Sequence, residues 1–196
     1  MAELLVTNPF LLALLAAMVA ETCAILIRAV TPSLSRWFWW LANLISLLAL
    51  VSFLWSFLWA ASVHEDFLEV LSVPETFFGV LSITGGGGLL LWSFAALGWR
   101  SFFAWSNASF ETRHAYAHIR RPMFIGTAFF SLGVALLLSR DALWIWMAFW
   151  VVLSQPLLEL EEWELRMRFP MAKEYYARTR RYIPGGFWAR VTSSRK

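Results

Sequence analysis

The positively charged residues of this chain are sorted among the connections between five apolar stretches. All but one of its 16 Lys and Arg residues lie in the first connection, the third connection or the tail, and the exception is Arg140. The second connection carries only acidic charges. The apolar stretches cover residues 9–29, 37–61, 78–97, 123–138 and 142–160. Because a helix needs about 20 apolar residues to cross a bilayer, we expect an all-α polytopic membrane bundle of about five transmembrane helices.

The same alternation predicts how the chain is oriented. Lys and Arg are enriched in cytoplasmic connections, so we expect the amino terminus outside and the carboxyl terminus in the cytoplasm. The whole chain, residues 1–196, then forms one integral membrane domain. Any polar site is expected in its cytoplasmic segments, residues 98–122 and 161–196, the second of which is a helical tail.

Composition excludes several other classes of protein. The chain is 60% hydrophobic and 15% charged, which leaves more apolar surface than a water-soluble domain of this size can bury. With one cysteine, Cys23, and three histidines, no internal disulfide can form and we expect no metal site. The net charge of +3 reflects membrane topology, and we see no nucleic-acid module.

Two features lie inside the apolar stretches. Glu21 is an intramembrane carboxylate, which is costly unless it is paired. We favour a pair with Arg28, and the alternative is a coupling site of a small Glu21-dependent transporter. The glycine run at residues 85–88 predicts close helix packing or a local kink, because it lacks the lysine of a phosphate-binding loop.

Two arginines precede the fourth apolar stretch. Arg120 and Arg121 are followed by Pro122, which suits the first turn of a helix. The guanidinium groups then lie beside free N–H groups, a combination that suits a carboxylate or a phosphate. The alternative is that they anchor the span against anionic headgroups.

Carboxylates and aromatic residues follow the fifth stretch. We expect the helix to continue past a kink at Pro156 and to carry Glu159, Glu161 and Glu162 out of the membrane. These carboxylates suit the ammonium of an amino-acid-like cofactor or a pairing with the two arginines. The tail at residues 175–184 is basic with interleaved aromatic rings, which by itself is typical of a membrane-surface helix.

Taken in order, these segments resemble the superfamily of membrane methyltransferases that includes the isoprenylcysteine carboxyl and phospholipid methyltransferases. The resemblance covers roughly Leu97 to Pro184. The matching residues, with Phe124 standing for a usual tyrosine, are Tyr116, Arg120, Pro122, Phe124, Gly126, Glu161, Glu162, Leu165, Tyr175, Thr179, Arg181 and Pro184.

The resemblance implies a site for S-adenosylmethionine at the cytoplasmic ends of the last spans, with a lipid-like acceptor entering from the bilayer. It implies that Glu162 holds the cofactor's ammonium, that Arg120 and Arg121 hold its carboxylate, and that the tail covers the adenosine. It identifies no catalytic residue. The implied cofactor-binding residues are Tyr116, His118, Arg120, Arg121, Pro122, Phe124, Gly126, Glu161, Glu162, Tyr175, Arg178 and Arg181.

The chain departs from the family pattern at three places. His114 and Ala115 replace Gly-Pro, Arg121 replaces a histidine, and Leu157 replaces an arginine implicated in acceptor chemistry. Methylation of an isoprenylcysteine carboxylate is therefore not expected. We expect a methyltransferase for a lipid-like or small membrane-soluble acceptor, whose identity and oligomeric state the sequence leaves open. The alternatives are an NADPH-dependent sterol-type reductase, the Glu21-coupled transporter, and a non-catalytic membrane protein that retains the fold.

Overall fold

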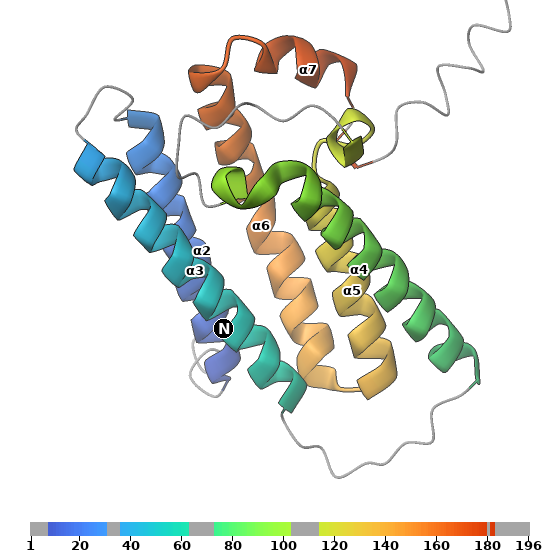
Figure 1. Ribbon diagram of the computed structural model, residues 1–196. Helices are drawn as coiled ribbons and strands as arrows, with labels where there is room; N and C mark the ends of the chain where they lie inside the picture. Colours follow the sequence, from blue (N-terminus) through green and yellow to red (C-terminus); the bar gives the residue numbers. More distant parts are fainter. Residues whose placement is uncertain (1–7, 31–35, 63–72, 103–113, 180, 183–196) are drawn as a thin grey trace, which may run out of the picture.

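All regular structure in the described part of the chain is helical, as the sequence predicts. The computed structural model describes residues 8–30, 36–62, 73–102, 114–179 and 181–182. The elements, shown in Figure 1, are α2 (Pro9–Val30), α3 (Arg36–Ser62), α4 (Val73–Phe102), the 3₁₀ turn η1 (His114–Ala117), α5 (Pro122–Leu138), α6 (Asp141–Arg168) and α7 (Ala172–Arg178).

Four of these helices are long and apolar enough to cross a membrane. Their apolar segments are Pro9–Ala29, Trp40–Ser62, Val73–Gly98 and Asp141–Arg168. The predicted fourth span is the shorter helix α5, whose 17 residues cover about 25 Å. Large apolar side chains stay exposed along the outer faces, as expected of surfaces that meet lipid. The membrane-helix character of the bundle is thus confirmed.

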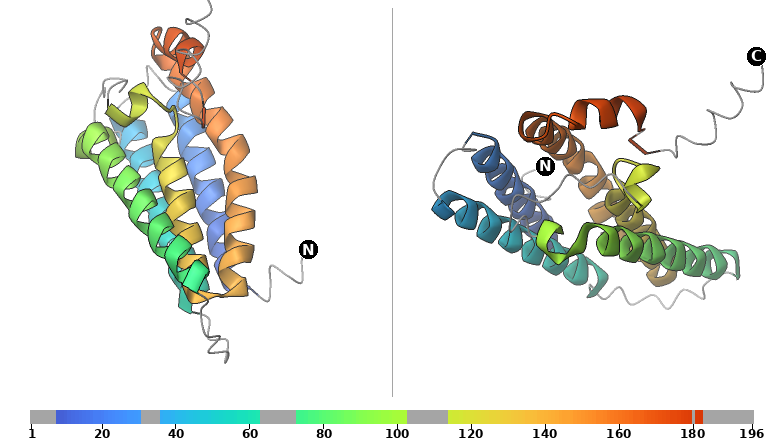
Figure 2. Two further views of the ribbon diagram at one scale, coloured as in Figure 1. Left: turned by 90° about the vertical axis from the view of Figure 1, so that its right-hand side faces the viewer. Right: turned by 45° about the horizontal axis from the view of Figure 1, so that its top comes forward.

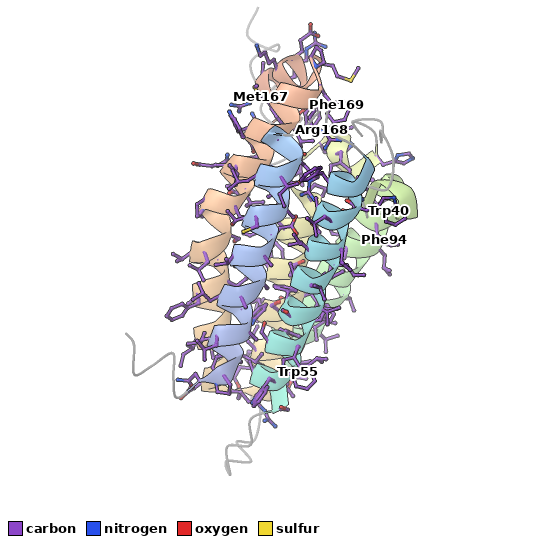
Figure 3. All side chains as sticks on the ribbon, turned by 90° about the vertical axis from the view of Figure 1, so that its left-hand side faces the viewer. Trp40, Trp55, Phe94, Met167, Arg168 and Phe169 are labelled. Carbon is purple, nitrogen blue, oxygen red and sulfur yellow. The ribbon has the colours of Figure 1, made fainter. Side chains whose placement is uncertain are left out.

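Exposed tryptophans mark both ends of α3. Figure 3 shows Trp40 near one end of the bundle and Trp55 near the other, and both side chains are more than half exposed. Their separation of 15 positions corresponds to roughly 22 Å of helix. Tryptophan rings at the two boundaries of an apolar band are typical of membrane–water interfaces.

Successive long helices run in opposite directions. The carboxyl ends of α2, α4 and α6 therefore lie at the same end of the bundle as the starts of α3 and α5, together with η1 and α7 (Figures 1 and 2). We call this the site end. Arg28, Arg120 and Arg121 all belong to it, which is the clustering that the charge alternation predicts.

Two helical hairpins and α6 form the bundle. Helix α2 packs on α3, α4 packs on α5, and α6 contacts α2, α3 and α5. Trp146 of α6 is fully buried, and its indole N–H donates to the Ser56 hydroxyl of α3 at 2.9 Å. Its ring stacks on Trp150 with centroids 5.8 Å apart. The hydrogen bond to Ser56 and ring contacts of Trp146 with Phe53 and Phe57 join the α2–α3 hairpin to α6.

Glycines let the backbones of α4 and α5 touch. A Cβ placed on Gly86 would lie 2.4 Å from the backbone nitrogen of Phe130, and one on Gly133 would lie 2.6 Å from the Gly79 carbonyl. The packing role predicted for the glycine run is confirmed at Gly86. The neighbouring Gly85 faces open space.

The ends of α5 and α6 also lie where the local sequence predicts them. Pro122 occupies the first turn of α5. Ser139 ends that helix in the left-handed conformation (φ 48°), and its N–H donates to the Ala135 carbonyl at 2.9 Å. Helix α6 begins two residues later and runs without interruption through Pro156 to Arg168, which confirms that the last span extends as a helix.

Replacing Gly86 with alanine should destabilise the bundle, because the added methyl group meets backbone atoms that cannot move without separating α4 from α5. Overpacking of this kind costs about 1–3 kcal/mol. The same substitution at Gly85 should be neutral or slightly stabilising, since alanine is the better helix former by up to about 1 kcal/mol. Thermal unfolding in detergent measures both variants, and equal melting temperatures would contradict the glycine contact.

Candidate functional site

A cavity of about 490 Å³ lies at the site end of the bundle. All seven described elements contribute to its lining, so it is enclosed by segments far apart in the sequence. Its size is in the range of small-molecule and cofactor sites. The charged lining residues are Glu21, Arg28, Arg120, Arg121, Glu161, Glu164 and Arg168. Figure 3 shows Arg168, with the lining residue Phe169, at the site end of α6.

Arg121 is held at the start of α5 by groups from α6. Its guanidinium donates to the Glu161 carboxylate and, at 2.9 Å, to the Leu158 carbonyl. The Nε–H has no hydrogen-bond acceptor among the described residues, although Glu162 Oε1 lies 3.8 Å away. Burial, the largest single influence, would lower the pKa of Arg121, but attraction to Glu161, Tyr176 and Glu162 and the hydrogen bond to Glu161 together outweigh it and leave that pKa raised. The side chain therefore stays charged.

Arg120 fastens the tail over the cavity. It donates hydrogen bonds to the carbonyls of Thr179 and Tyr176, and its guanidinium lies 5.2 Å from the centre of the Tyr176 ring. The Tyr175 hydroxyl donates to the Tyr116 carbonyl of η1 at 2.6 Å. Burial raises the pKa of Tyr176, so its phenol stays protonated at neutral pH. The three tyrosines all line the cavity.

Glu162 is surrounded by guanidinium groups. Its side chain is 3% exposed, and its oxygens lie 3.0 Å from Arg181, 3.4 Å from Arg166, 3.7 Å from Arg120 and 3.8 Å from Arg121. The hydrogen bond to Glu162 raises the pKa of Arg181. Glu162 does not line the cavity. Its carboxylate thus ties the tail and the start of α5 to α6.

A second ionic cluster connects α2, α3 and α6. Arg28 donates to Glu21 at 3.0 Å and to the Ser46 hydroxyl at 2.9 Å, and its Nε lies 3.5 Å from Glu164. Glu164 also accepts a hydrogen bond from Arg168 at 2.7 Å. The predicted pair of Glu21 with Arg28 is confirmed. Sequence reasoning missed the roles of Glu164 and Arg168, for which the four-residue spacing of opposite charges was the available signal.

The structure brings most of the predicted cofactor-binding residues together. Those that line the cavity are Tyr116, Arg120, Arg121, Pro122, Phe124, Glu161 and Tyr175. Glu162 and Arg181 lie behind this lining. His118 and Arg178 are exposed at the surface, where Arg178 lies 3.9 Å from Glu174, and Gly126 packs against Gly86 of α4. Pro184 lies outside the described residues.

Glu162→Gln should loosen the tail, because one neutral amide replaces the charge that faces four guanidinium groups. Charge-assisted hydrogen bonds contribute about 1.5–3 kcal/mol, so trypsin should cleave after Arg178 at least about ten times faster. Limited proteolysis in detergent measures the rate. Asp141→Asn is the control because Asp141 is exposed at the start of α6, at the opposite end of the bundle; equal rates for the two variants and the wild type would contradict the tail attachment.

Comparison with known proteins gives no match to any family model, curated protein or solved structure.

Proposed function

We propose that this protein is an S-adenosylmethionine-dependent methyltransferase that acts on a lipid-like or small membrane-soluble acceptor. The observation that carries the proposal is the cavity at the site end. Its polar part is built by the start of α5, the end of α6 and the tail, which are the segments that resemble the membrane methyltransferases. Its remaining wall belongs to α2, α3 and α4 and is mostly apolar, with Glu21, Arg28, Asn43 and Ser46 as its polar residues.

The lining suits the functional groups of S-adenosylmethionine. The buried Nε–H of Arg121 has no hydrogen-bond acceptor in the part of the chain that the structure describes, and a ligand carboxylate can supply one. Glu161 is the carboxylate beside it that reaches the cavity, and we assign the ammonium to Glu161 rather than to Glu162, which already faces four arginines. The rings of Tyr116, Tyr175 and Tyr176 provide surfaces for the adenosine.

When bound, the cofactor supplies a methyl group on a positively charged sulfur. The chain's contribution is to orient the two reactants and to keep water out. Arg121 and Glu161 hold the carboxylate and the ammonium of the cofactor in the polar part of the cavity. The tail residues that Arg120 binds cover this part of the cavity. Such positioning can supply most of the rate enhancement of a transfer that needs little acid or base assistance.

The membrane provides the acceptor in this proposal. In the described part of the chain, helix α4 packs mainly on α5 and η1 and has at most a few contacts with α3, although both α3 and α4 line the cavity. An apolar molecule can therefore enter from the bilayer between these two helices. We place the site end in the cytoplasm, with the amino terminus outside, because the basic residues gather at that end.

Calorimetric titration of the detergent-purified protein with S-adenosylmethionine tests the proposal. We expect micromolar binding by the wild type and a loss of about tenfold or more in Glu161→Gln, since the ammonium would lose a charged partner. Glu159→Gln is the matched control on the same helix, because Glu159 is exposed and lies outside the cavity lining. It should bind as the wild type does.

Two results would overturn the proposal. Absence of binding by a folded wild-type sample would remove the cofactor on which the activity depends. Binding of NADPH in place of S-adenosylmethionine would assign the same cavity to a reductase. Equal affinity of Glu161→Gln and the wild type would refute the residue assignment alone.

A further inference from the structure

The apolar part of the cavity lies deeper in the bundle than its polar part. On α3, Phe53 lies seven positions beyond Ser46, which corresponds to roughly 10 Å of helix away from the site end. On α2, Ala17 lies four positions, or roughly 6 Å, deeper than Glu21. The apolar part of the cavity therefore extends up to roughly 10 Å beyond the level of the polar groups.

Three aromatic rings close the deep end of this apolar part. Phe53 of α3 and Phe124 of α5 line the cavity. The ring of Trp150 from α6 lies against both, with its centroid 6.1 Å from that of Phe53 and 4.9 Å from that of Phe124. Beyond these rings the bundle is filled by core residues such as Leu14 and Trp146, which do not line the cavity. We call Phe53, Phe124 and Trp150 the aromatic floor.

The opening toward the bilayer lies near the other end of the apolar part. In the described part of the chain, α4 lines the cavity through Leu97, which directly precedes the backbone break at Gly98 near the site end of that helix. The deeper apolar lining belongs to α2, α3, α5 and α6, and includes Met18, Leu50 and Leu157. A molecule that enters between α3 and α4 therefore arrives near the polar groups, and the apolar part beneath it is a blind pocket.

We propose that the aromatic floor limits the length of the acceptor, and that Phe53 sets this limit. A saturated chain advances about 1.3 Å per methylene group, because its single bonds of about 1.5 Å form a zigzag. The roughly 10 Å between the polar groups and the floor therefore holds about eight carbons in line. This inference rests on the proposed function and deepens it, because it assigns the site to short-bodied acceptors and excludes long single chains.

A chain that is too long can bind only by displacing the aromatic floor. The ring of Phe53 also contacts Trp146, with centroids 5.3 Å apart, so moving it disturbs the buried core. Overpacking of this kind should lower the affinity about tenfold or more. Shorter chains gain little from each added methylene group, because the lipid or detergent that they leave is as apolar as the pocket. Affinity should therefore stay level with increasing length and then fall.

Calorimetry with straight-chain alkanols tests the limit without relying on turnover. We expect the detergent-purified wild type to bind hexanol and octanol with similar affinity and dodecanol about tenfold or more weakly, each referred to its mole fraction in the micelles. Micelles without protein provide the blank. The series requires no variant, so a folding defect cannot obscure it. Equal affinity for octanol and dodecanol would overturn the proposal, as would a failure of octanol to bind.

Variants then assign the limit to the floor. Phe53→Leu should reduce the loss of affinity for dodecanol at least about threefold, because the shorter side chain deepens the pocket. Ala17→Leu should extend the loss to octanol, because the larger side chain fills the deep end. Phe57→Leu is the matched control, since Phe57 lies one turn farther along α3, packs on Trp146 and does not line the cavity. A dodecanol affinity in Phe53→Leu equal to that of Phe57→Leu would refute the role of Phe53.

The two proposals fail separately. Binding of S-adenosylmethionine without a length limit would overturn only the restriction on the acceptor. A length limit without cofactor binding would leave a blind apolar pocket in a protein that is not this methyltransferase.

Discussion

Three glutamates in the last turns of α6 hold the site end together. Glu161 forms an ion pair with Arg121 at the start of α5, Glu162 with Arg181 of the tail, and Glu164 with Arg28 of α2. Glu162 and Glu164 are buried, and a buried charge is unfavourable unless it is paired. The requirement for pairing therefore fixes three separate segments to one helix, and the cavity is the space they leave between them.

Much of the fold follows from local patterns in the sequence. The apolar stretches, Pro122 at a helix start and the turn at Arg140 are determined by length, backbone geometry and solvation, which a short window of residues reveals. The pair of Glu21 and Arg28 was equally accessible, because both residues lie on one helix at a separation of about two turns.

The arrangement of the site could be predicted from the sequence only in part. A set of arginines and glutamates in the right segments indicates that ion pairs form, but their identity depends on how α2, α5 and the tail approach α6. The contacts of Glu162 with Arg120, Arg121 and Arg181, and that of Arg28 with Glu164, are consequences of that approach. Gly126 illustrates the same limit, because a glycine that fits a sequence pattern can equally serve a helix contact, as it does here against Gly86.

The unequal lengths of α5 and α6 have a geometric consequence. The two helices share a tight turn at one end, and α6 has 28 residues against 17 in α5. Helix α6 therefore overhangs the start of α5 by roughly 16 Å. Helix α7 packs on α6, and η1 packs on α4. The cavity at the site end therefore exists because one helix of the hairpin stops short. If α5 were two turns longer at its start, the added residues would occupy the space beside the overhanging part of α6, whatever their side chains.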